Sequence, residues 1–248
     1  MKMVFIPGIN GMGKTRGCEL NLGYISHPDK FEKINLNSED ISSELADISK
    51  KTKKYFSQGE KVFFLGGDHS ISFSLVRNFF REFGEKSRLL VFDAHPDLME
   101  PMQEPTHEEW LRAIIEAGFS PENILIVGVR RRSRNIDKKE LEFAREKGIR
   151  IIFPDEFGKM ENEILNFASS GTLYISFDID VFDSSLVSKT GYPERGGLGE
   201  EFFPFFKKIS HLENFKFLDF VEMNLSIESL ADRSMEFYNK ILEGFEKQ

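Results

Sequence analysis

The sequence is poor in cysteine and in long hydrophobic runs. It contains 1 Cys among 248 residues, which excludes a disulfide framework and a zinc site built from cysteines. No apolar run approaches the length of about 18 residues that a membrane span needs. No basic and apolar leader precedes the first expected strand, so we expect neither a membrane anchor nor a secretory signal.

Positive charge is also in deficit. Lys and Arg number 33 against 41 Asp and Glu, for a formal net charge of −8. This acidic balance argues against a nucleic-acid partner and favours a cytoplasmic protein. The length suits one α/β domain, and no internal repeat or Pro/Gly linker divides it, so we expect residues 1–248 to form a single domain.

Short apolar runs rich in β-branched and aromatic residues recur along the chain and predict eight strands. The runs are nearly unbroken rather than alternating, which is typical of parallel strands buried on both faces. The predicted strands cover residues 2–6, 33–36, 61–65, 88–92, 124–128, 149–153, 172–177 and 215–221.

Stretches with helical spacing separate these strands. We expect Ser38 to cap the first helix and Thr106 the third. The alternation of strands and helices predicts an α/β fold with right-handed crossovers and helices on both faces of one sheet. The predicted helices cover residues 38–57, 72–83, 106–117, 137–147, 155–169, 200–210 and 226–245.

Acidic and histidine side chains follow four of the predicted strands. Ligands bind outside the carboxyl ends of parallel strands, and residues two apart in extended chain point to the same side. The groups at these ends are His69 after the third strand, Asp93-x-His95-x-Asp97 after the fourth, Asp178-x-Asp180 after the seventh, and Glu222 after the eighth.

The convergence of carboxylates and imidazoles at one sheet edge points to metal binding. Bare carboxylates in contact repel one another, and some would stay protonated. Divalent cations remove that repulsion. The donors exceed what one ion needs, so we expect two ions, and oxygen-rich ligation with two imidazoles favours manganese.

The same residues resemble the ureohydrolase family of arginases, agmatinases and formimidoylglutamases. The resemblance rests on Gly-Gly-Asp-His at 66–69, Asp-Ala-His-Pro-Asp at 93–97 and Ser-Phe-Asp-Ile-Asp at 176–180, with further matches at 128–130, 190–193, 196–198 and 221–224. It implies a three-layer α/β/α sandwich around a mostly parallel eight-stranded sheet.

The resemblance also implies an activity, which is hydrolysis of a guanidino group to urea and an amine by hydroxide formed between two Mn²⁺ ions. Glu222 would grip the guanidinium, His107 would pass a proton to the leaving amine, and Asp97 would serve in catalysis as well as in ligation. A homo-oligomer, either a trimer or a hexamer, is expected. The implied metal ligands are His69, Asp93, His95, Asp97, Asp178 and Asp180.

Departures from the family pattern bear on the substrate. Tyr192 stands where the family has a second Thr, and its larger ring would narrow the pocket and contact the substrate. Glu100 and Glu104, on the loop after Asp97, favour a cationic substrate tail and hence agmatine. The arginines at 130–134 would favour a carboxylate if they faced the pocket, so arginase and formimidoylglutamase activities stay open.

Two other classes of function compete with this interpretation. Residues 8–15 fit the phosphate-binding P-loop pattern, with Lys14 and Thr15 at its end. The residues that follow, Arg16-Gly17-Cys18-Glu19, are a poor start to a helix, and a nucleotide site would leave the histidines and paired aspartates unused. The third class is an inactive relative that keeps the metal ligands.

Overall fold

One sheet of eight strands forms the centre of the molecule. The computed structural model describes residues 1–8, 22–36, 40–227, 229 and 231–246. All strand pairs within these residues are parallel, in the order β2-β1-β3-β8-β7-β4-β5-β6. The strands are β1 (Lys2–Ile6), β2 (Phe31–Lys33), β3 (Val62–Gly66), β4 (Ser87–Phe92), β5 (Ile124–Val127), β6 (Arg150–Ile152), β7 (Thr172–Asp178) and β8 (Phe215–Val221).

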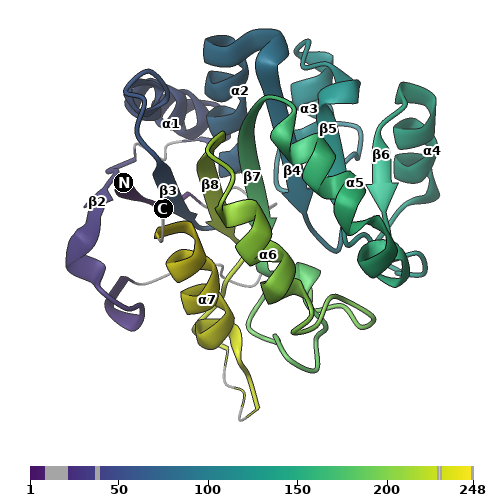
Figure 1. The fold of residues 1–248 in the computed structure, drawn as a ribbon. Coiled ribbons are helices and arrows are strands. Elements are labelled where there is room, and N and C mark those ends of the chain that lie inside the picture. The colour runs from purple at the N-terminus through teal and green to yellow at the C-terminus, as the bar shows by residue number, and fades with distance from the viewer. Residues whose placement is uncertain (9–21, 37–39, 228, 230, 247–248) are drawn as a thin grey trace.

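Helices cover both faces of this sheet (Figure 1). Side chains of α1 to α4 share one hydrophobic core with one face, and those of α5 to α7 share a second core with the other. The predicted three-layer α/β/α sandwich is therefore confirmed. The helices are α1 (Ile41–Phe56), α2 (Ile71–Phe83), α3 (Trp110–Glu116), α4 (Lys138–Lys147), α5 (Phe157–Ser169), α6 (Phe202–Ser210) and α7 (Ser234–Glu246).

The strand β3 illustrates why its sequence is an unbroken apolar run. Val62 and Phe64 enter the core beneath α1 and α2, whereas Phe63 and Leu65 enter the core on the opposite face. All four are at most 1% exposed. A strand covered on both sides has no solvent face, so the usual alternation of apolar and polar residues disappears.

Several predicted boundaries were wrong, and side-chain hydrogen bonds explain two of them. The third helix begins at Trp110 rather than at residue 106, because the Glu109 carboxylate accepts from the Thr106 amide at 2.8 Å and closes a turn before the helix. The last helix begins at Ser234, whose amide donates to Asp232 at 3.0 Å, instead of at residue 226.

The start of the chain's first long helix and its second strand also differ from prediction. Asp40 caps α1 by accepting from the Ser43 amide at 2.7 Å, while the predicted cap Ser38 lies outside the described residues. The strand β2 covers Phe31–Lys33 instead of 33–36.

Four neighbouring strands at the middle of the sheet position the candidate site. The strands β3, β8, β7 and β4 lie side by side. Their carboxyl ends at Gly66, Val221, Asp178 and Phe92 therefore meet at one edge, as the sequence predicted.

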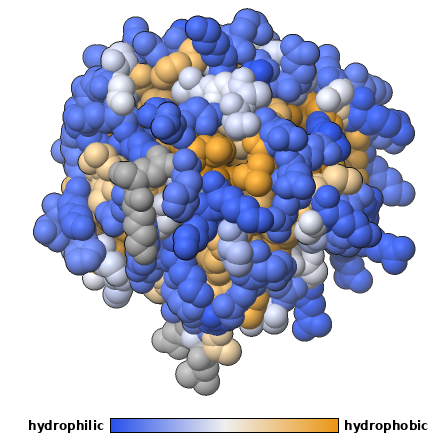
Figure 2. Space-filling model, viewed as in Figure 1, coloured by the Kyte–Doolittle hydropathy of each residue, from blue (hydrophilic) through white to orange (hydrophobic). Residues whose placement is uncertain are grey.

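Figure 2 shows the hydropathy of one face of the molecule. That face is mostly hydrophilic, and hydrophobic side chains show chiefly near its centre. Among the helices in the described ranges, none has the length and apolar character that a bilayer crossing requires.

Candidate metal centre

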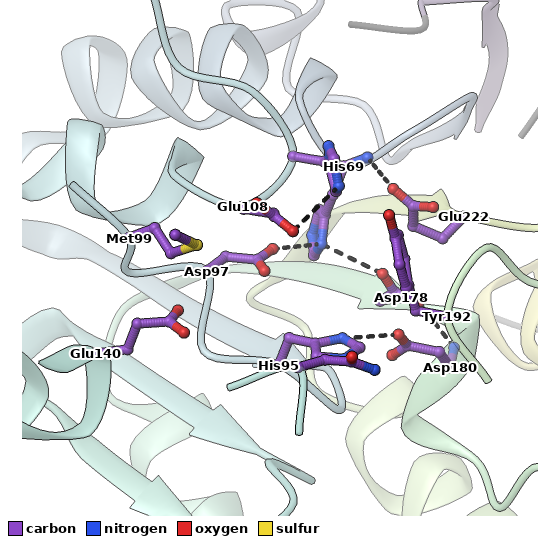
Figure 3. A pocket seen from close by; sticks show the side chains of 12 residues that line it. His69, His95, Asp97, Met99, Glu108, Glu140, Asp178, Asp180, Tyr192 and Glu222 are labelled. Carbon is purple, nitrogen blue, oxygen red and sulfur yellow. Dashed lines mark hydrogen bonds and ion pairs between the residues drawn. The ribbon is translucent and has the colours of Figure 1, made fainter. Parts of the chain in front are cut away.

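His69 lies at the centre of a buried cluster of carboxylates. Its Nδ1 is 3.0 Å from Asp93 Oδ2, 3.0 Å from Asp97 Oδ2 and 3.5 Å from Asp178 Oδ2. Figure 3 shows His69, Asp97 and Asp178 pointing toward one another. His69, Asp93 and Asp97 form a group close enough to hold one metal ion.

A second group lies beside the first. His95 Nδ1 is 2.9 Å from Asp180 Oδ2 and 3.6 Å from Asp93 Oδ1. One ligand atom each from Asp93, His95 and Asp180 lies within 4.8 Å of the other two, which is close enough to hold one ion. Asp93 belongs to both groups: its Oδ2 faces His69, and its Oδ1 faces His95. The structure thus brings all six predicted ligands together: five of them form two groups that share Asp93, and Asp178 Oδ2 lies 3.5 Å from His69 Nδ1.

Two buried polar atoms of the cluster support cation binding. His69 Nδ1 and Asp93 Oδ2 are buried and lie 3.0 Å apart, yet neither atom makes a hydrogen bond of proper geometry among the described residues. Buried polar atoms are normally paired, and oxygen-rich clusters with imidazole suit a hard or borderline divalent cation. The residues present therefore fit metal binding.

The cluster's electrostatics point the same way. Burial, reinforced by the charge of Asp93, raises the pKa of Asp97 to about 7. Burial and the neighbouring Asp180 and Asp93 raise the pKa of Asp178 well above its ordinary value. Burial alone would lower the pKa of His69, but the three carboxylates around it raise that pKa well above its usual range. The cluster gathers more negative charge than its own imidazoles balance, which is the situation that cations relieve.

Unusual backbone conformations hold two of the residues at this edge. Asp97 and Glu222 have positive φ values of 50° and 63°, a region that residues with a side chain rarely adopt and that costs on the order of 1–3 kcal/mol. Gly128 has φ 111°, and a Cβ there would lie 2.8 Å from the backbone oxygen of Asp93. Glycine is required there because the two chain segments approach so closely.

Contacts behind His69 orient its ring. Its Nε2 lies 2.9 Å from Ser176 Oγ, and the Ser176 hydroxyl donates to Asp219 at 2.7 Å. Tyr174 donates to the same carboxyl at 2.6 Å. Since the serine proton is directed to Asp219, Ser176 can only accept from His69, which puts the proton of the neutral ring on Nε2 and leaves Nδ1 free to ligate.

A cavity of about 110 Å³ opens beside the donor groups. That volume holds a few waters or part of a small ligand. Glu222 lies on its wall and accepts a hydrogen bond from the His69 amide at 2.8 Å. The cavity is lined by His69, His95, Asp97, Met99, His107, Glu108, Asn135, Glu140, Asp178, Asp180, Tyr192 and Glu222.

Two aromatic rings of the lining lie parallel. His107 and Tyr192 have ring centroids 6.1 Å apart and an interplanar angle of 13°. Neither ring nitrogen of the buried His107 has a hydrogen-bond partner in the part of the chain that is described. The structure therefore brings the predicted residues His107, Tyr192 and Glu222 to one cavity.

The predicted substrate contact Glu100 is not part of this cavity. Its side chain is 81% exposed and lies 3.8 Å from Arg112. The arginine cluster also points elsewhere, because the Arg130 guanidinium donates to the carbonyls of Asp180 and Val181 at 2.8 and 3.0 Å. Arg131 pairs with Glu156 at 2.7 Å. Neither Glu100 nor any arginine of residues 130–134 lines the cavity.

Sequence reasoning missed four lining residues, Met99, Glu108, Asn135 and Glu140. Glu140 closes a capping box with Asp137 at the start of α4, and that spacing of three residues was a detectable signal for its place in the fold. Glu140 also accepts from the Leu98 amide at 3.0 Å, a long-range contact that no local pattern predicts.

The P-loop hypothesis falls largely on residues 9–21, which lie outside those described. Of its residues only Gly8 is described, and the Gly8 carbonyl accepts from the Asp68 amide at 3.1 Å.

The sequence was compared with models of known protein families and with known proteins. The model of the arginase family matches residues 21–243. An agmatinase from Pyrococcus horikoshii is 36% identical over 138 residues, which is 55% of this chain and 44% of the relative. A guanidinopropionase from Pseudomonas aeruginosa is 31% identical over 172 residues, which is 66% of this chain and 53% of the relative. The chain thus spans about half the length of these curated relatives.

A solved structure extends the comparison to the fold. Arginase from Bacillus subtilis superposes with a TM-score of 0.85 at 20% identity, covering 100% of this chain and 98% of that one. This likeness concerns the fold alone. Because the family model spans most of the chain, the chain belongs to the arginase family.

Proposed function

We propose that this protein is a binuclear manganese ureohydrolase that cleaves a small guanidino compound, agmatine above all, to urea and an amine. The observation that carries the proposal is the pair of donor groups that share Asp93, because their other members line a cavity. Those members are His69, Asp97, His95 and Asp180. Two Mn²⁺ ions held there would acidify water and so supply hydroxide near neutral pH.

Glu222 is the residue that we assign to the guanidinium. It lies on the cavity wall, and the His69 amide that donates to its Oε1 at 2.8 Å fixes the orientation of the carboxylate. A carboxylate in a buried setting forms strong charge-assisted hydrogen bonds with guanidinium N–H groups. Glu222 would therefore orient the guanidinium carbon toward the donor groups.

His107 is the residue that we assign to proton transfer. Its ring nitrogens are buried without a hydrogen-bond partner within the described ranges, and its ring stacks on Tyr192 at the cavity. An imidazole so placed can donate a proton to the departing amine nitrogen. Tyr192 holds the ring in place and narrows the cavity at the same point. Asp97 would assist catalysis through the metal that it ligates.

The charge around the cavity supports a substrate with a cationic tail. Glu108 and Glu140 line it, and Glu194 lies 3.9 Å from His95 Nε2. Among the described residues, the lining contains no Lys or Arg. Such a wall attracts an amine and repels a carboxylate, which favours agmatine over arginine. The agmatinase from Pyrococcus horikoshii is a relative whose name agrees with this choice.

A panel of substrates tests the proposal. Urea release by the Mn²⁺-loaded protein should be highest with agmatine and lower with arginine and 4-guanidinobutyrate, which share the guanidino group but carry a carboxylate. Higher turnover of either carboxylate than of agmatine would contradict the assigned tail. Absence of urea from all of them, with metal bound, would contradict the proposed activity.

Two matched variants locate the tail. Glu108→Gln should raise the KM for agmatine about fivefold, since a charge about 4 Å away contributes about 1 kcal/mol in water. Glu100→Gln is the control, because Glu100 lies outside the cavity lining, and it should leave the KM unchanged. If Glu100→Gln raised the KM for agmatine and Glu108→Gln did not, the substrate tail would lie at Glu100 instead of Glu108.

The proposal includes a setting for the enzyme. The enzyme would act in the cytoplasm as a homo-oligomer, either a trimer or a hexamer as the family resemblance implies, and without a membrane partner. The acidic net charge of −8 supports the absence of a nucleic-acid partner. Light scattering of the purified protein would test the oligomer, and a molar mass of one chain would contradict it.

A further inference from the structure

Trp110 makes two contacts with the candidate metal ligands that the mechanism above does not use. Its indole Nε1 donates to Asp97 Oδ2 at 2.7 Å. Its ring centroid lies 4.8 Å from that of His69, at an interplanar angle of 37°. Trp110 is the first residue of α3 and is fully buried. One side chain therefore touches two of the three members of the first donor group.

The backbone near Trp110 holds Asp97 as well. The Arg112 amide donates to the Asp97 carbonyl at 3.3 Å, and the Met99 amide donates to the Glu108 carbonyl at 3.2 Å. These bonds tie the loop after Asp97 to the start of α3. Asp97 has φ 50°, a conformation that persists only where its surroundings enforce it. Trp110 supplies the matching restraint on the side chain.

We propose that Trp110 is a positioning residue for the metal ion at the His69–Asp93–Asp97 group. Its N–H sets the orientation of the Asp97 carboxylate, and its ring limits rotation of the His69 imidazole. Contacts of this kind typically change metal affinity 10- to 100-fold when they are removed. The inference rests on the proposed metal centre and is independent of the substrate.

The geometry also makes Trp110 a reporter of that ion. The sequence contains one tryptophan, so the tryptophan emission of the protein comes from a ring in contact with two ligands. Mn²⁺ is paramagnetic and quenches nearby fluorophores. Binding at the His69 group should therefore quench the emission, and binding at the His95 group alone should affect it less.

The test measures Mn²⁺ binding by calorimetry in three proteins stripped of metal. The unmodified chain should bind two ions. Trp110→Phe keeps a ring and removes the N–H, and it should weaken one of the two ions about 10- to 100-fold. Phe119→Leu is the matched control, since Phe119 is buried in the same core and contacts Phe80 at 4.8 Å between ring centroids. It should lower thermal stability and leave both affinities unchanged.

If Trp110→Phe binds both Mn²⁺ ions as tightly as the unmodified chain does, the proposal is overturned. It is also overturned if Phe119→Leu weakens Mn²⁺ binding as much as Trp110→Phe does. If Trp110→Phe does not fold, titration of the unmodified chain decides: quenching that accompanies Mn²⁺ binding supports the proposal, and unchanged emission after two ions bind refutes it. Binding that follows the prediction while urea is absent from every substrate would refute the proposed function alone.

Discussion

Replacing Ser176 with Ala removes the hydroxyl that links His69 to Asp219. Two hydrogen bonds disappear together, from His69 Nε2 at 2.9 Å and to Asp219 at 2.7 Å. Both partners stay buried. A buried polar group that loses its partner costs about 1–3 kcal/mol. Asp219 keeps its bonds from Tyr174 and Ser72, so the larger part of the cost falls on His69.

We therefore expect Ser176→Ala to lower the free energy of unfolding of the metal-free protein by about 2–4 kcal/mol. For a domain of this size that shifts the Tm by roughly 4–16 °C. The freed imidazole can rotate and can carry its proton on either nitrogen, so Mn²⁺ affinity should also fall, by about 10- to 100-fold. Urea denaturation and calorimetric titration with Mn²⁺ measure the two effects.

Ser72→Ala provides the comparison. The Ser72 hydroxyl donates to Asp219 Oδ2 at 3.1 Å. The Ser72 amide donates to the His69 carbonyl at 3.1 Å, a backbone bond that alanine keeps, so the substitution removes no bond to the His69 ring. Its loss should cost about 1 kcal/mol of stability and leave Mn²⁺ affinity unchanged. If Ser176→Ala and Ser72→Ala bind Mn²⁺ equally well, the argument that Ser176 fixes the His69 ring is refuted.

Three further predictions follow from the core and the cavity. Phe177→Ala, in a fully buried strand position, should lower the free energy of unfolding by about 3–5 kcal/mol in urea; a loss under about 1 kcal/mol would show that the core collapses around the gap. Glu222→Gln should keep two Mn²⁺ and lose most urea release, measured by calorimetry and a urea assay, and full turnover would remove Glu222 from substrate binding. The metal-free protein should lose stability as pH rises through about 7, because burial and Asp93 raise the pKa of Asp97 to about 7, and an acid with a raised folded pKa stabilises only below it. Urea melts at several pH values should show this fall, and added Mn²⁺ should abolish it; stability that rises through the same range would contradict the sign.

The strands and the sheet edge could be predicted because burial on both faces leaves a plain mark in the sequence. β3 is an apolar run throughout, and β7 is nearly one, interrupted by Ser176. The polar residues at or just after the ends of these strands meet because parallel strands end at one edge. Helix starts were harder, since a single side-chain bond such as that from Thr106 to Glu109 outweighs the local helical pattern. β2, three residues long at the sheet's margin, has too little pattern to locate.

Part of the candidate site depends on contacts between distant segments and leaves no local signal. Asp219 is a charged residue inside a buried strand, and only the fold reveals that Ser176 and Tyr174 lie within reach of it. The same holds for the bond from Trp110 to Asp97. An acidic residue of the cavity was expected at Glu100, yet that side chain is exposed, and the turn before α3 places Glu108 in the lining instead.

Hydrolysis of a guanidino compound at this cavity should require two manganese ions. The most direct test is urea release from agmatine, measured as the stripped protein is titrated with Mn²⁺. We expect no urea without metal and a rate that rises to a plateau at two ions per chain. Urea release that needs no metal, or two bound ions with no urea from agmatine, would contradict it.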